Sequence, residues 1–452
     1  MKIMFVRPKP SHETIGLQHL MVVEPLELEI LYALIRQKDD GVIIDLIIEK
    51  KPFMYFVKKH SPHVICFTGY ITNVSTIINY CQETKKFSNN ITTIVGGVHC
   101  EVCPEDFIDD AIDFRVVRNA TSVFTPLLNH IENNAPLPDA VYVKNQIPDI
   151  NQLPAFNFYT PFPARHATNK YRKKYFYIFQ DKVALIKTSF GCPFSCNFCF
   201  CRLITDKLYF QRPMHEVIQE LMTIKEKEVY IVDDDFLVEP RRVMHFIEEV
   251  KKNKINKKYL IYGRADFIAN NAEIIHQFAQ VGLRTVIVGF ESFNDNELQT
   301  YQKKTNVLMY HKTMDVLNKE KIDCFATVII HPHWDKNDFR HMVGMIKKLG
   351  IYFVNLQPLT PLPKTTLNVD NHKIIINPKD YEKWDLAHVS YEPQKMTVSE
   401  FYKEILHSYN AVLYHPATLW KYITSYSPRM LFKMLVGGYK VTKQYKKKIK
   451  DG

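Results

Sequence analysis

The chain has 452 residues, of which 46% are apolar and 24% charged, and a formal charge of +11. A chain of this length can bury a large core and divides into two or three domains. We see no secretion signal and no run of the ~18 apolar residues that a membrane span requires, so we expect a cytoplasmic protein whose cysteines are thiols or metal ligands and not disulfides.

Residues 1–135 alternate short apolar runs with helical segments. Segments with helical periodicity, such as 25–37 and 73–87, separate five runs with the length and composition of buried strands: 2–8, 42–49, 63–70, 92–99 and 113–119. This alternation predicts a doubly wound, Rossmann-like α/β domain.

Glycine follows two of these strands, in Thr68-Gly69-Tyr70 and in Gly96-Gly97-Val98-His99. Glycine allows a large planar or phosphate-bearing ligand to approach the backbone closely, but it is also an ordinary turn residue. Both interpretations stay open at this point. Residues 136–180, in which repeated prolines interrupt both periodicities, are expected to be an ordered linker.

Four cysteines then crowd into TSFGCPFSCNFCFCR. Cys192, Cys196 and Cys199 have the spacing CxxxCxxC, and Cys201 follows two residues later. Zinc usually takes two pairs of Cys or His separated by a dozen or more residues, and no second pair follows here. Three thiolates on one loop can instead hold three irons of a four-iron cluster and leave the fourth iron open to a substrate or cosubstrate.

Helical and strand patterns alternate strictly from residue 214 to residue 359. The order predicts a parallel sheet curled into a full or partial (β/α) barrel over residues 181–368, with its site at the carboxyl ends of the strands. Polar residues gather at these ends: Asp233, Asp234, Asp235, Arg264, Glu291, Ser292, His331, His333 and Gln357.

The cysteine loop resembles the radical S-adenosylmethionine (SAM) superfamily, whose signature CxxxCxΦC, with Φ aromatic, matches Cys192, Cys196, Phe198 and Cys199. The resemblance implies that the three cysteines hold a four-iron four-sulfur (4Fe-4S) cluster whose open iron is chelated by SAM. It further implies that an electron from the cluster cleaves SAM to methionine and a 5′-deoxyadenosyl radical. Cys201 lies outside the signature and is expected to be a bystander.

The same resemblance implies the contacts of SAM. Phe198 is expected beside the adenine, and Asp234, Arg264 and Glu291 are expected to meet the ribose, amino or carboxylate groups. The alternative for each of these three residues is a strand-end group that caps a helix or pairs with a neighbour.

Placed before this motif, the N-terminal domain resembles the cobalamin-binding domain of the cobalamin-dependent radical SAM enzymes, and the pairing extends to about Asn368. The resemblance implies that five residues border the corrin or its nucleotide tail: Thr68, Gly69, Gly96, Gly97 and His99. The DxHxxG motif that supplies a lower histidine to cobalt in other cobalamin proteins is absent from the sequence. A domain that no longer binds cobalamin is therefore the alternative, and a lower protein ligand to cobalt stays undecided.

Residues 369–452 are expected to form a mostly helical region with a basic tail, which from Lys403 onward carries ten Lys or Arg against two acids. Trp384, His388 and the following EPQKM resemble the same region of enzymes related to the hopanoid methylases. Lysines interleaved with aromatic and aliphatic residues suit an anionic membrane surface. No RNA-binding module is visible, so nucleic acid is the less favoured partner, and a solvated, partly disordered terminus is the other alternative.

These resemblances imply an enzyme with a 4Fe-4S cluster, SAM and cobalamin, reduced by an external electron donor such as flavodoxin or ferredoxin. The favoured activity is methylation of an unactivated carbon of a small-molecule or lipid substrate. A cyclase or rearrangement enzyme without net methyl transfer is one alternative, and a non-catalytic iron–sulfur sensor or scaffold is another. No residue is assigned as catalytic, and neither the substrate nor the oligomeric state follows from the sequence.

Overall fold

The computed structural model describes residues 1–147, 149, 152–178, 180–367 and 373–451. The chain forms two compact units. The first unit consists of Met1–Thr14, Glu24–Lys174 and Pro378–Asp385, and the second of Ile15–Val23, Tyr175–Asn377 and Leu386–Gly452. The expected boundary at residues 368–369 lies outside the described residues.

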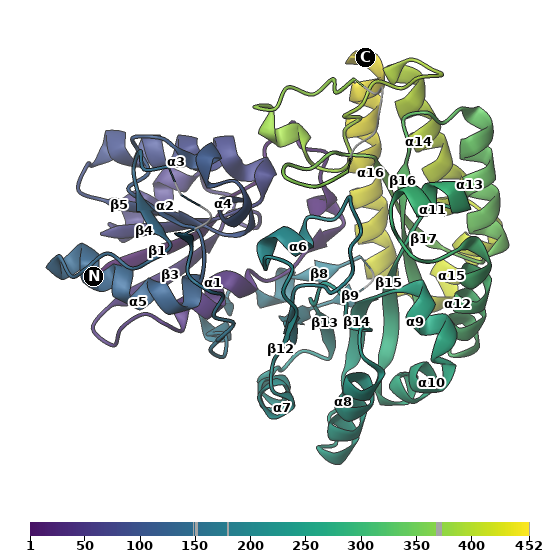
Figure 1. The fold of residues 1–452 in the computed structure, drawn as a ribbon, viewed down its shortest axis with the longest axis horizontal. Coiled ribbons are helices and arrows are strands. Elements are labelled where there is room, and N and C mark those ends of the chain that lie inside the picture. The colour runs from purple at the N-terminus through teal and green to yellow at the C-terminus, as the bar shows by residue number, and fades with distance from the viewer. Residues whose placement is uncertain (148, 150–151, 179, 368–372, 452) are drawn as a thin grey trace. The chain divides into compact units, whose positions relative to one another are not determined.

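A six-stranded sheet forms the centre of the first unit (Figure 1). Its strands, in spatial order, are β3 (Asp40–Asp45), β1 (Lys2–Arg7), β4 (Val64–Thr68), β5 (Thr92–Gly96), β6 (Phe114–Val116) and β7 (Val141–Val143). All neighbours are parallel except the antiparallel pair β6 and β7. From β1 the chain builds the sheet first to one side and then, from β4 onward, to the other, and ligands of open α/β sheets bind at such a switch point.

Helices cover both faces of this sheet. They are α1 (Leu26–Tyr32), α2 (Phe53–His60), α3 (Val74–Phe87), α4 (Val98–Val102) and α5 (Ala120–Asn133). Successive strand residues point to opposite faces, so Met4 and Val6 of β1 pack with α2 and α3, whereas Ile3 and Phe5 pack with α1 and α5. The expectation of a doubly wound domain is confirmed. The β7 strand was not expected, because it falls within the proline-rich residues 136–180.

The second unit contains a parallel sheet in which spatial order follows chain order. Its strands are β10 (Val183–Ile186), β13 (Glu228–Ile231), β14 (Lys258–Gly263), β15 (Leu283–Glu291), β16 (Asp323–Ile330) and β17 (Phe353–Pro358). Within the described residues β17 does not pair with β10, so the sheet is open. The expectation of a full or partial barrel is thus confirmed in its partial form.

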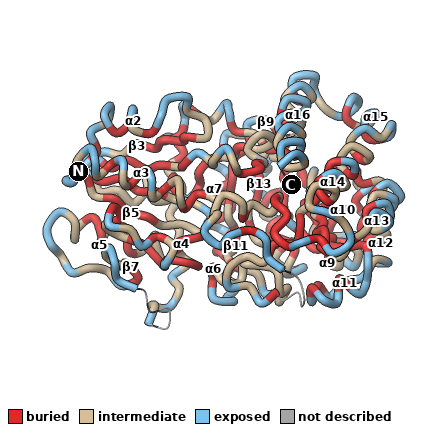
Figure 2. Tube along the Cα trace, turned by 90° about the horizontal axis from the view of Figure 1, so that it is seen from above, coloured by how far each residue is buried: buried red, intermediate tan, exposed pale blue. Residues whose placement is uncertain are grey.

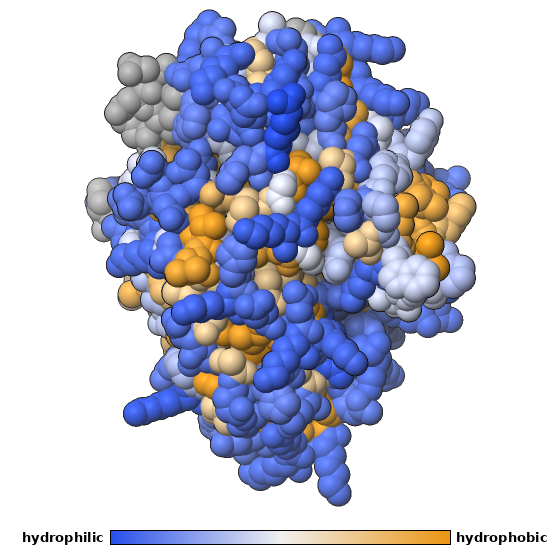
Figure 3. Space-filling model, turned by 90° about the vertical axis from the view of Figure 1, so that its right-hand side faces the viewer, coloured by the Kyte–Doolittle hydropathy of each residue, from blue (hydrophilic) through white to orange (hydrophobic). Residues whose placement is uncertain are grey.

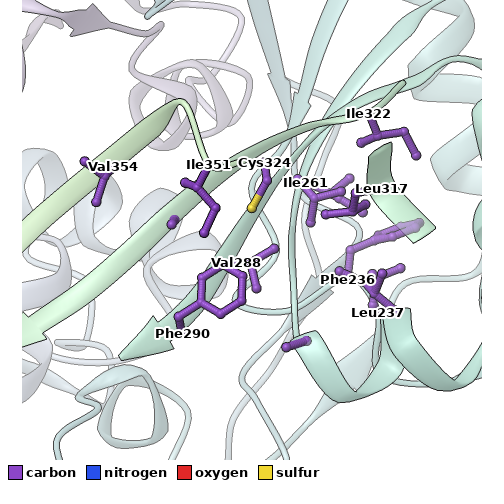
Figure 4. Packing of buried hydrophobic residues seen from close by; sticks show 14 of the residues in the cluster. Phe236, Leu237, Ile261, Val288, Phe290, Leu317, Ile322, Cys324, Ile351 and Val354 are labelled. Atoms are coloured by element: carbon purple, nitrogen blue, oxygen red, sulfur yellow. The ribbon is translucent and has the colours of Figure 1, made fainter. Parts of the chain in front are cut away.

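Helices between these strands cover the outer face of the sheet (Figure 1). They are α7 (Met214–Thr223), α8 (Pro240–Lys252), α9 (Ala265–Asn270), α10 (Ala272–Val281), α11 (Asp295–Thr300), α12 (Val307–Lys319) and α13 (Lys336–Lys348). Alternate strand residues supply the core against them, as Ile261, Val288 and Cys324 do beside Phe236 and Leu317 (Figure 4). The remaining strand positions face the interior of the partial barrel.

Short strands complete the second unit. β2 (Met21–Val22), β8 (Phe176–Tyr177) and β9 (Gln180–Asp181) form a small antiparallel sheet, and β11 (Ser189–Phe190) pairs with β12 (Phe210–Gln211). The helix α6 (Cys201–Ile204) lies between β11 and β12 in the chain. These two strands therefore bracket the cysteine loop.

Three helices end the chain: α14 (Val398–Leu413), α15 (Pro416–Ser425) and α16 (Pro428–Asp451). Long exposed stretches of α15 and α16 are visible in Figure 2. Figure 3 shows a mostly hydrophilic face of the second unit on which apolar side chains form separate patches. Among the described residues, no helix has the length and apolar character needed to cross a membrane.

Candidate functional site

The cysteine loop leaves the carboxyl end of β10, where sites of parallel α/β sheets are built. Cys192, Cys196, Cys199 and Cys201 are half-buried, and all four are free thiols. Burial raises the pKa of Cys192 to about 12 and also raises that of Cys196, whereas the neighbouring Cys201 thiol lowers the pKa of Cys199. The loop thus places four thiols, which are soft metal ligands, after one strand end.

Asp233 fixes the start of this loop. Its buried carboxylate accepts hydrogen bonds from the backbone N–H and hydroxyl of Thr188 (2.6 and 2.5 Å) and from those of Ser189 (3.0 and 2.7 Å). Arg242 donates to the Thr188 carbonyl at 2.8 Å. Asp233 is therefore committed to holding the loop and is not available to a ligand.

Gly191, directly before Cys192, allows the chain to turn into the loop. Its φ is +74°, and a Cβ at this position would lie 2.0 Å from the Leu208 carbonyl oxygen. Any side chain would be strained by the backbone angle and would also displace the backbone at Leu208, two residues before β12. The path of the cysteine loop thus depends on this glycine.

Arg264 and Glu291, both expected near SAM, lie at the same end of the sheet and are joined by Lys303. The Arg264 guanidinium stacks on Phe194 of the cysteine loop at 4.0 Å and donates to the Lys303 carbonyl at 2.8 Å. The Lys303 ammonium in turn donates to Glu291 at 2.8 Å. Glu291 has a φ of +64°, an unusual value for a residue other than glycine, and such backbone strain is concentrated at functional sites.

Asp234 and Phe198, the other two expected SAM contacts, also lie beside this group. Asp234 is half-buried and forms an ion pair with Lys187 at 3.7 Å. The Phe198 ring lies 5.7 Å from the ring of Tyr301 and 6.0 Å from the Lys303 ammonium. Asp234, Glu291 and also Arg264, which donates to Asp266 at 2.9 and 3.0 Å, thus each have a neighbouring partner at the strand ends. Both interpretations of these three residues therefore stay open.

Several buried polar atoms at this end have no hydrogen-bond partner among the described residues: Asp235 Oδ2, Tyr301 Oη, Asn197 Oδ1 and Thr305 Oγ1. Leaving such atoms unpaired costs ~1–3 kcal/mol each, so groups of them indicate a missing ligand. Burial raises the pKa of Asp235 to about 7. Three thiols together with these unpaired donors and acceptors fit an iron–sulfur cluster and a polar cosubstrate.

The other expected site is at the carboxyl ends of β4 and β5, next to the switch point between β1 and β4, and we call it the switch-point edge. Gly97 has a φ of +92°, and a Cβ there would lie 2.6 Å from Thr68 Oγ1 and 3.1 Å from the Gly69 nitrogen. The ends of β4 and β5 therefore approach each other closely, and three residues there, Gly69, Gly96 and Gly97, carry no side chain. Gly96, the last residue of β5, has room for a Cβ, with Val116 at 3.7 Å. An edge of this kind fits a large planar group such as a corrin or its nucleotide tail.

The His99 side chain contacts a carboxylate of the same unit. Its Nε2 lies 2.8 Å from Asp106 Oδ2, and its side chain is buried. Tyr381, from the returning segment Pro378–Asp385, donates to Asp106 Oδ1 at 2.9 Å. His99, Cys103 and Asp106 place possible metal ligand atoms within 4.8 Å of one another. The imidazole is thus engaged by Asp106, while its backbone N–H donates to the Gly69 carbonyl at 3.3 Å.

Sequence reasoning missed several of these residues. Phe194 lies inside the cysteine motif but at an unspecified position. Tyr301 and Lys303 follow β15 in a polar stretch that resembles a solvated helix end. Only the clustering of aromatic and basic residues in YQKK, just after the expected strand-end Glu291, could have drawn attention to them.

Two family models match the chain. The model of the radical SAM superfamily matches residues 186–346, and the model of the B12 binding domain matches residues 14–128. These ranges contain the cysteine loop with its strand ends and the switch-point edge, respectively. The chain therefore carries both domains.

Relatives of known activity match most of the chain. The hopanoid C-3 methylase of Methylococcus capsulatus is 26% identical over 93% of this chain and 81% of its own length. The bacteriochlorophyllide d C-8(2)-methyltransferase of Chlorobaculum tepidum is 23% identical over 76% of each chain. The structure of the methyltransferase TsrM from Kitasatospora setae with cobalamin and a [4Fe-4S] cluster covers 99% of both chains with a TM-score of 0.69 at 12% identity, which shows a shared fold.

Proposed function

The chain is a cobalamin-dependent radical SAM enzyme, and from this premise we propose that it methylates an unactivated carbon of an apolar small molecule or lipid. The observation that supports the proposal is the presence of two candidate cofactor sites in one chain. One is the cysteine loop with unpaired polar atoms around it, and the other is the switch-point edge opened by Gly97. The relatives named above support methylation as the outcome.

The cofactors supply chemistry that side chains lack: a one-electron cleavage of SAM that yields a carbon radical, and a transferable methyl group on cobalamin. We assign Cys192, Cys196 and Cys199 to the cluster. Asp233 and Gly191 hold these cysteines in place through the loop contacts described above. Cys201 is left as a neighbour of Cys199.

Around SAM we assign Phe198 to the adenine and the polar groups of Asp234, Arg264 and Glu291 to the ribose, amino and carboxylate groups. Arg264 is already oriented by Asp266, with contacts of 2.9 and 3.0 Å, and by its stacking on Phe194. A guanidinium fixed in this way binds without losing much side-chain entropy. Thr68, Gly69, Gly96, Gly97 and the backbone of His99 are assigned to the border of cobalamin.

Two further parts of the proposal concern partners. Reduction of the cluster requires an external one-electron donor, such as flavodoxin or ferredoxin. A hydrophobic substrate resides in a membrane, which agrees with the hopanoid methylase relative and with a peripheral position at the inner membrane face. Nucleic acid is not part of the proposal.

The test is anaerobic reconstitution of the purified protein with iron, sulfide and cobalamin, followed by reduction in the presence of SAM carrying a labelled methyl group. Lipid extracts from cells with and without the gene supply the candidate substrate, compared by mass spectrometry. A product heavier by one labelled methyl group supports the proposal. A rearranged or cyclised product without the label would assign the alternative chemistry, and a loaded protein that never cleaves SAM would leave only a sensor or scaffold.

A further inference from the structure

The helix α16 packs on the second unit by one face only. Met430, Gly437 and Tyr445 are its buried residues. A Cβ at Gly437 would lie 2.4 Å from the His19 carbonyl oxygen, so the backbone of α16 packs directly against the backbone at His19. The ring of Tyr445 lies 6.1 Å from those of Tyr402 and Tyr409 of α14. These contacts fix which face of α16 points away from the protein.

The opposite face of α16 is apolar in its first half. Phe432, Leu435 and Tyr439 recur at the spacing of one helix face, and each is between 67% and 70% exposed. Single exposed apolar residues are common on protein surfaces, but a row of large ones opposite a packed face is not. This half of the helix therefore presents an apolar surface that the described part of the chain leaves uncovered.

The same face becomes basic in its second half. Lys443, Lys446 and Lys450 continue the row after Tyr439, and all three are exposed. The whole helix carries eight basic residues, and Asp451 is its single acidic residue. An apolar stretch followed by lysines on one helix face is typical of helices that lie at an anionic membrane surface.

The preceding helix α15 also exposes large apolar side chains. Trp420 and Ile423 are 70% and 67% exposed, while Tyr422, on its other side, is stacked on Phe353 at 5.2 Å. Only Tyr426 and Ser427 separate α15 from α16. We call Trp420, Ile423, Phe432, Leu435 and Tyr439 the apolar row, and Lys443, Lys446 and Lys450 the basic row.

We propose that the apolar row enters the interface of an anionic lipid bilayer while the basic row binds the phosphate headgroups. Charge complementarity favours a lipid surface over a second copy of the chain. Two copies related by a twofold axis would set these helices against each other, and Asp451 is the single carboxylate on α16 with which to meet eight cations. A bilayer supplies both an apolar layer and a dense layer of phosphate.

This proposal deepens the proposed function, since it brings the enzyme to the place where an apolar substrate resides. The proposed function explains only why the enzyme would bind a membrane. The binding surface itself is inferred from α15 and α16 and does not depend on the reaction. Vesicle binding requires neither cluster nor SAM turnover. Failure of lipid binding and failure of methylation are therefore separate results.

The experiment is co-sedimentation of the full chain with vesicles containing phosphatidylglycerol, compared with vesicles of phosphatidylcholine alone, at rising salt. We expect binding to the anionic vesicles that decreases as salt screens the lysines. The triple variant Lys443→Glu/Lys446→Glu/Lys450→Glu should bind about a hundredfold more weakly or worse, since each lysine contributes about fivefold. Lys312→Glu/Lys347→Glu/Lys348→Glu, at exposed lysines elsewhere, is the control with the same change in charge.

A second set of variants tests the apolar row. Phe432→Ser/Leu435→Ser should weaken binding about tenfold or more, because the variant has two fewer large apolar side chains to transfer from water into the lipid. Leu308→Ser, at a leucine of α12 that is 69% exposed, should bind like the unaltered chain. A chain that ignores phosphatidylglycerol vesicles would overturn the proposal. So would a salt-independent binding that the lysine variants share, or a dimer that the Phe432→Ser/Leu435→Ser variant disrupts without any lipid binding.

Discussion

Lys303 donates a 2.8 Å hydrogen bond to the carboxylate of Glu291, and both side chains are buried. Burial lowers the pKa of Lys303, but the Glu291 carboxylate and Cys196 together outweigh burial and raise this pKa above its usual value. The ammonium is therefore kept charged inside the protein, next to Phe198 of the cysteine loop. This pair links the strained end of β15 to the expected SAM site.

Replacing Lys303 by Met should destabilise the second unit, because Glu291 is then left buried without its cation. Breaking a buried pair in this way costs about 3–5 kcal/mol. Thermal unfolding of the metal-free protein should shift down by several degrees. Lys304→Met, at the exposed neighbouring lysine, is the control and should change stability by less than ~0.5 kcal/mol. Equal melting temperatures for the two variants would mean that the pair is not formed.

Changing any one of Cys192, Cys196 and Cys199 to Ala should abolish both the brown cluster chromophore and SAM cleavage. Two thiolates on the loop would not retain a cluster that needs three. Cys201→Ala should keep both properties, which absorbance and iron content per chain will show. SAM cleavage by the triple alanine variant would refute a radical mechanism.

Gly97→Ala should block cobalamin binding. The added Cβ would meet Thr68 Oγ1 and the Gly69 nitrogen, and the backbone angle there disfavours any side chain. Isothermal titration with cobalamin measures the effect, and circular dichroism checks that the variant is folded. Gly344→Ala, where a Cβ meets nothing within 4 Å, is the control. If the unaltered, folded chain binds no cobalamin, the proposed methyl carrier is lost.

Tyr301→Phe should weaken SAM binding without destabilising the protein. The Tyr301 hydroxyl is buried without a partner in the described structure, so its removal should leave the melting temperature unchanged or higher. If SAM supplies the missing partner, its Kd should rise about two- to tenfold, the value of one hydrogen bond. An unchanged Kd would remove Tyr301 from the SAM site.

Glu29 should make the stability of the first unit depend on pH. Burial and the nearby Glu24 carboxylate raise the pKa of Glu29 to about 8, from an ordinary value of 4.5. Between these values the folded chain holds a proton that the unfolded chain has lost, so folding becomes more favourable as pH falls from 9 to 6. In the unaltered chain the free energy of unfolding should be on the order of 1–3 kcal/mol larger at pH 6 than at pH 9 because of this group, and Glu29→Gln should remove that difference. Melting curves at both pH values, with the exposed Glu83→Gln as control, measure it.

The regular elements could be predicted because their patterns are local. The strands that became β1, β4, β5 and β16 each carry enough apolar residues to show their character without the rest of the chain. β7 has only three residues, Val141–Val143, too few for any period to be seen among prolines. Its place at the sheet edge is decided by pairing with β6, which is a tertiary contact.

The site was predictable where residue type and spacing carry the chemistry, as in the cysteine motif. The partners of those residues were not. Asp106 and Tyr381 are 275 positions apart in the chain, and no sequence pattern joins them. Likewise, the sequence predicted His99 at the border of a ligand, but it did not show that a carboxylate seven residues later engages the ring. Burial and long-range packing decide such pairings, and they exist only in the folded chain.

The segment Pro378–Asp385 belongs to the first unit although the residues on either side of it belong to the second. During synthesis the first unit therefore lacks a part of itself until residue 385 has left the ribosome, long after its sheet has been made. The hydrogen bond from Tyr381 to Asp106 forms only then. A fragment that ends at Lys174 would lack this donor to Asp106, so residues more than 200 positions downstream complete the first unit.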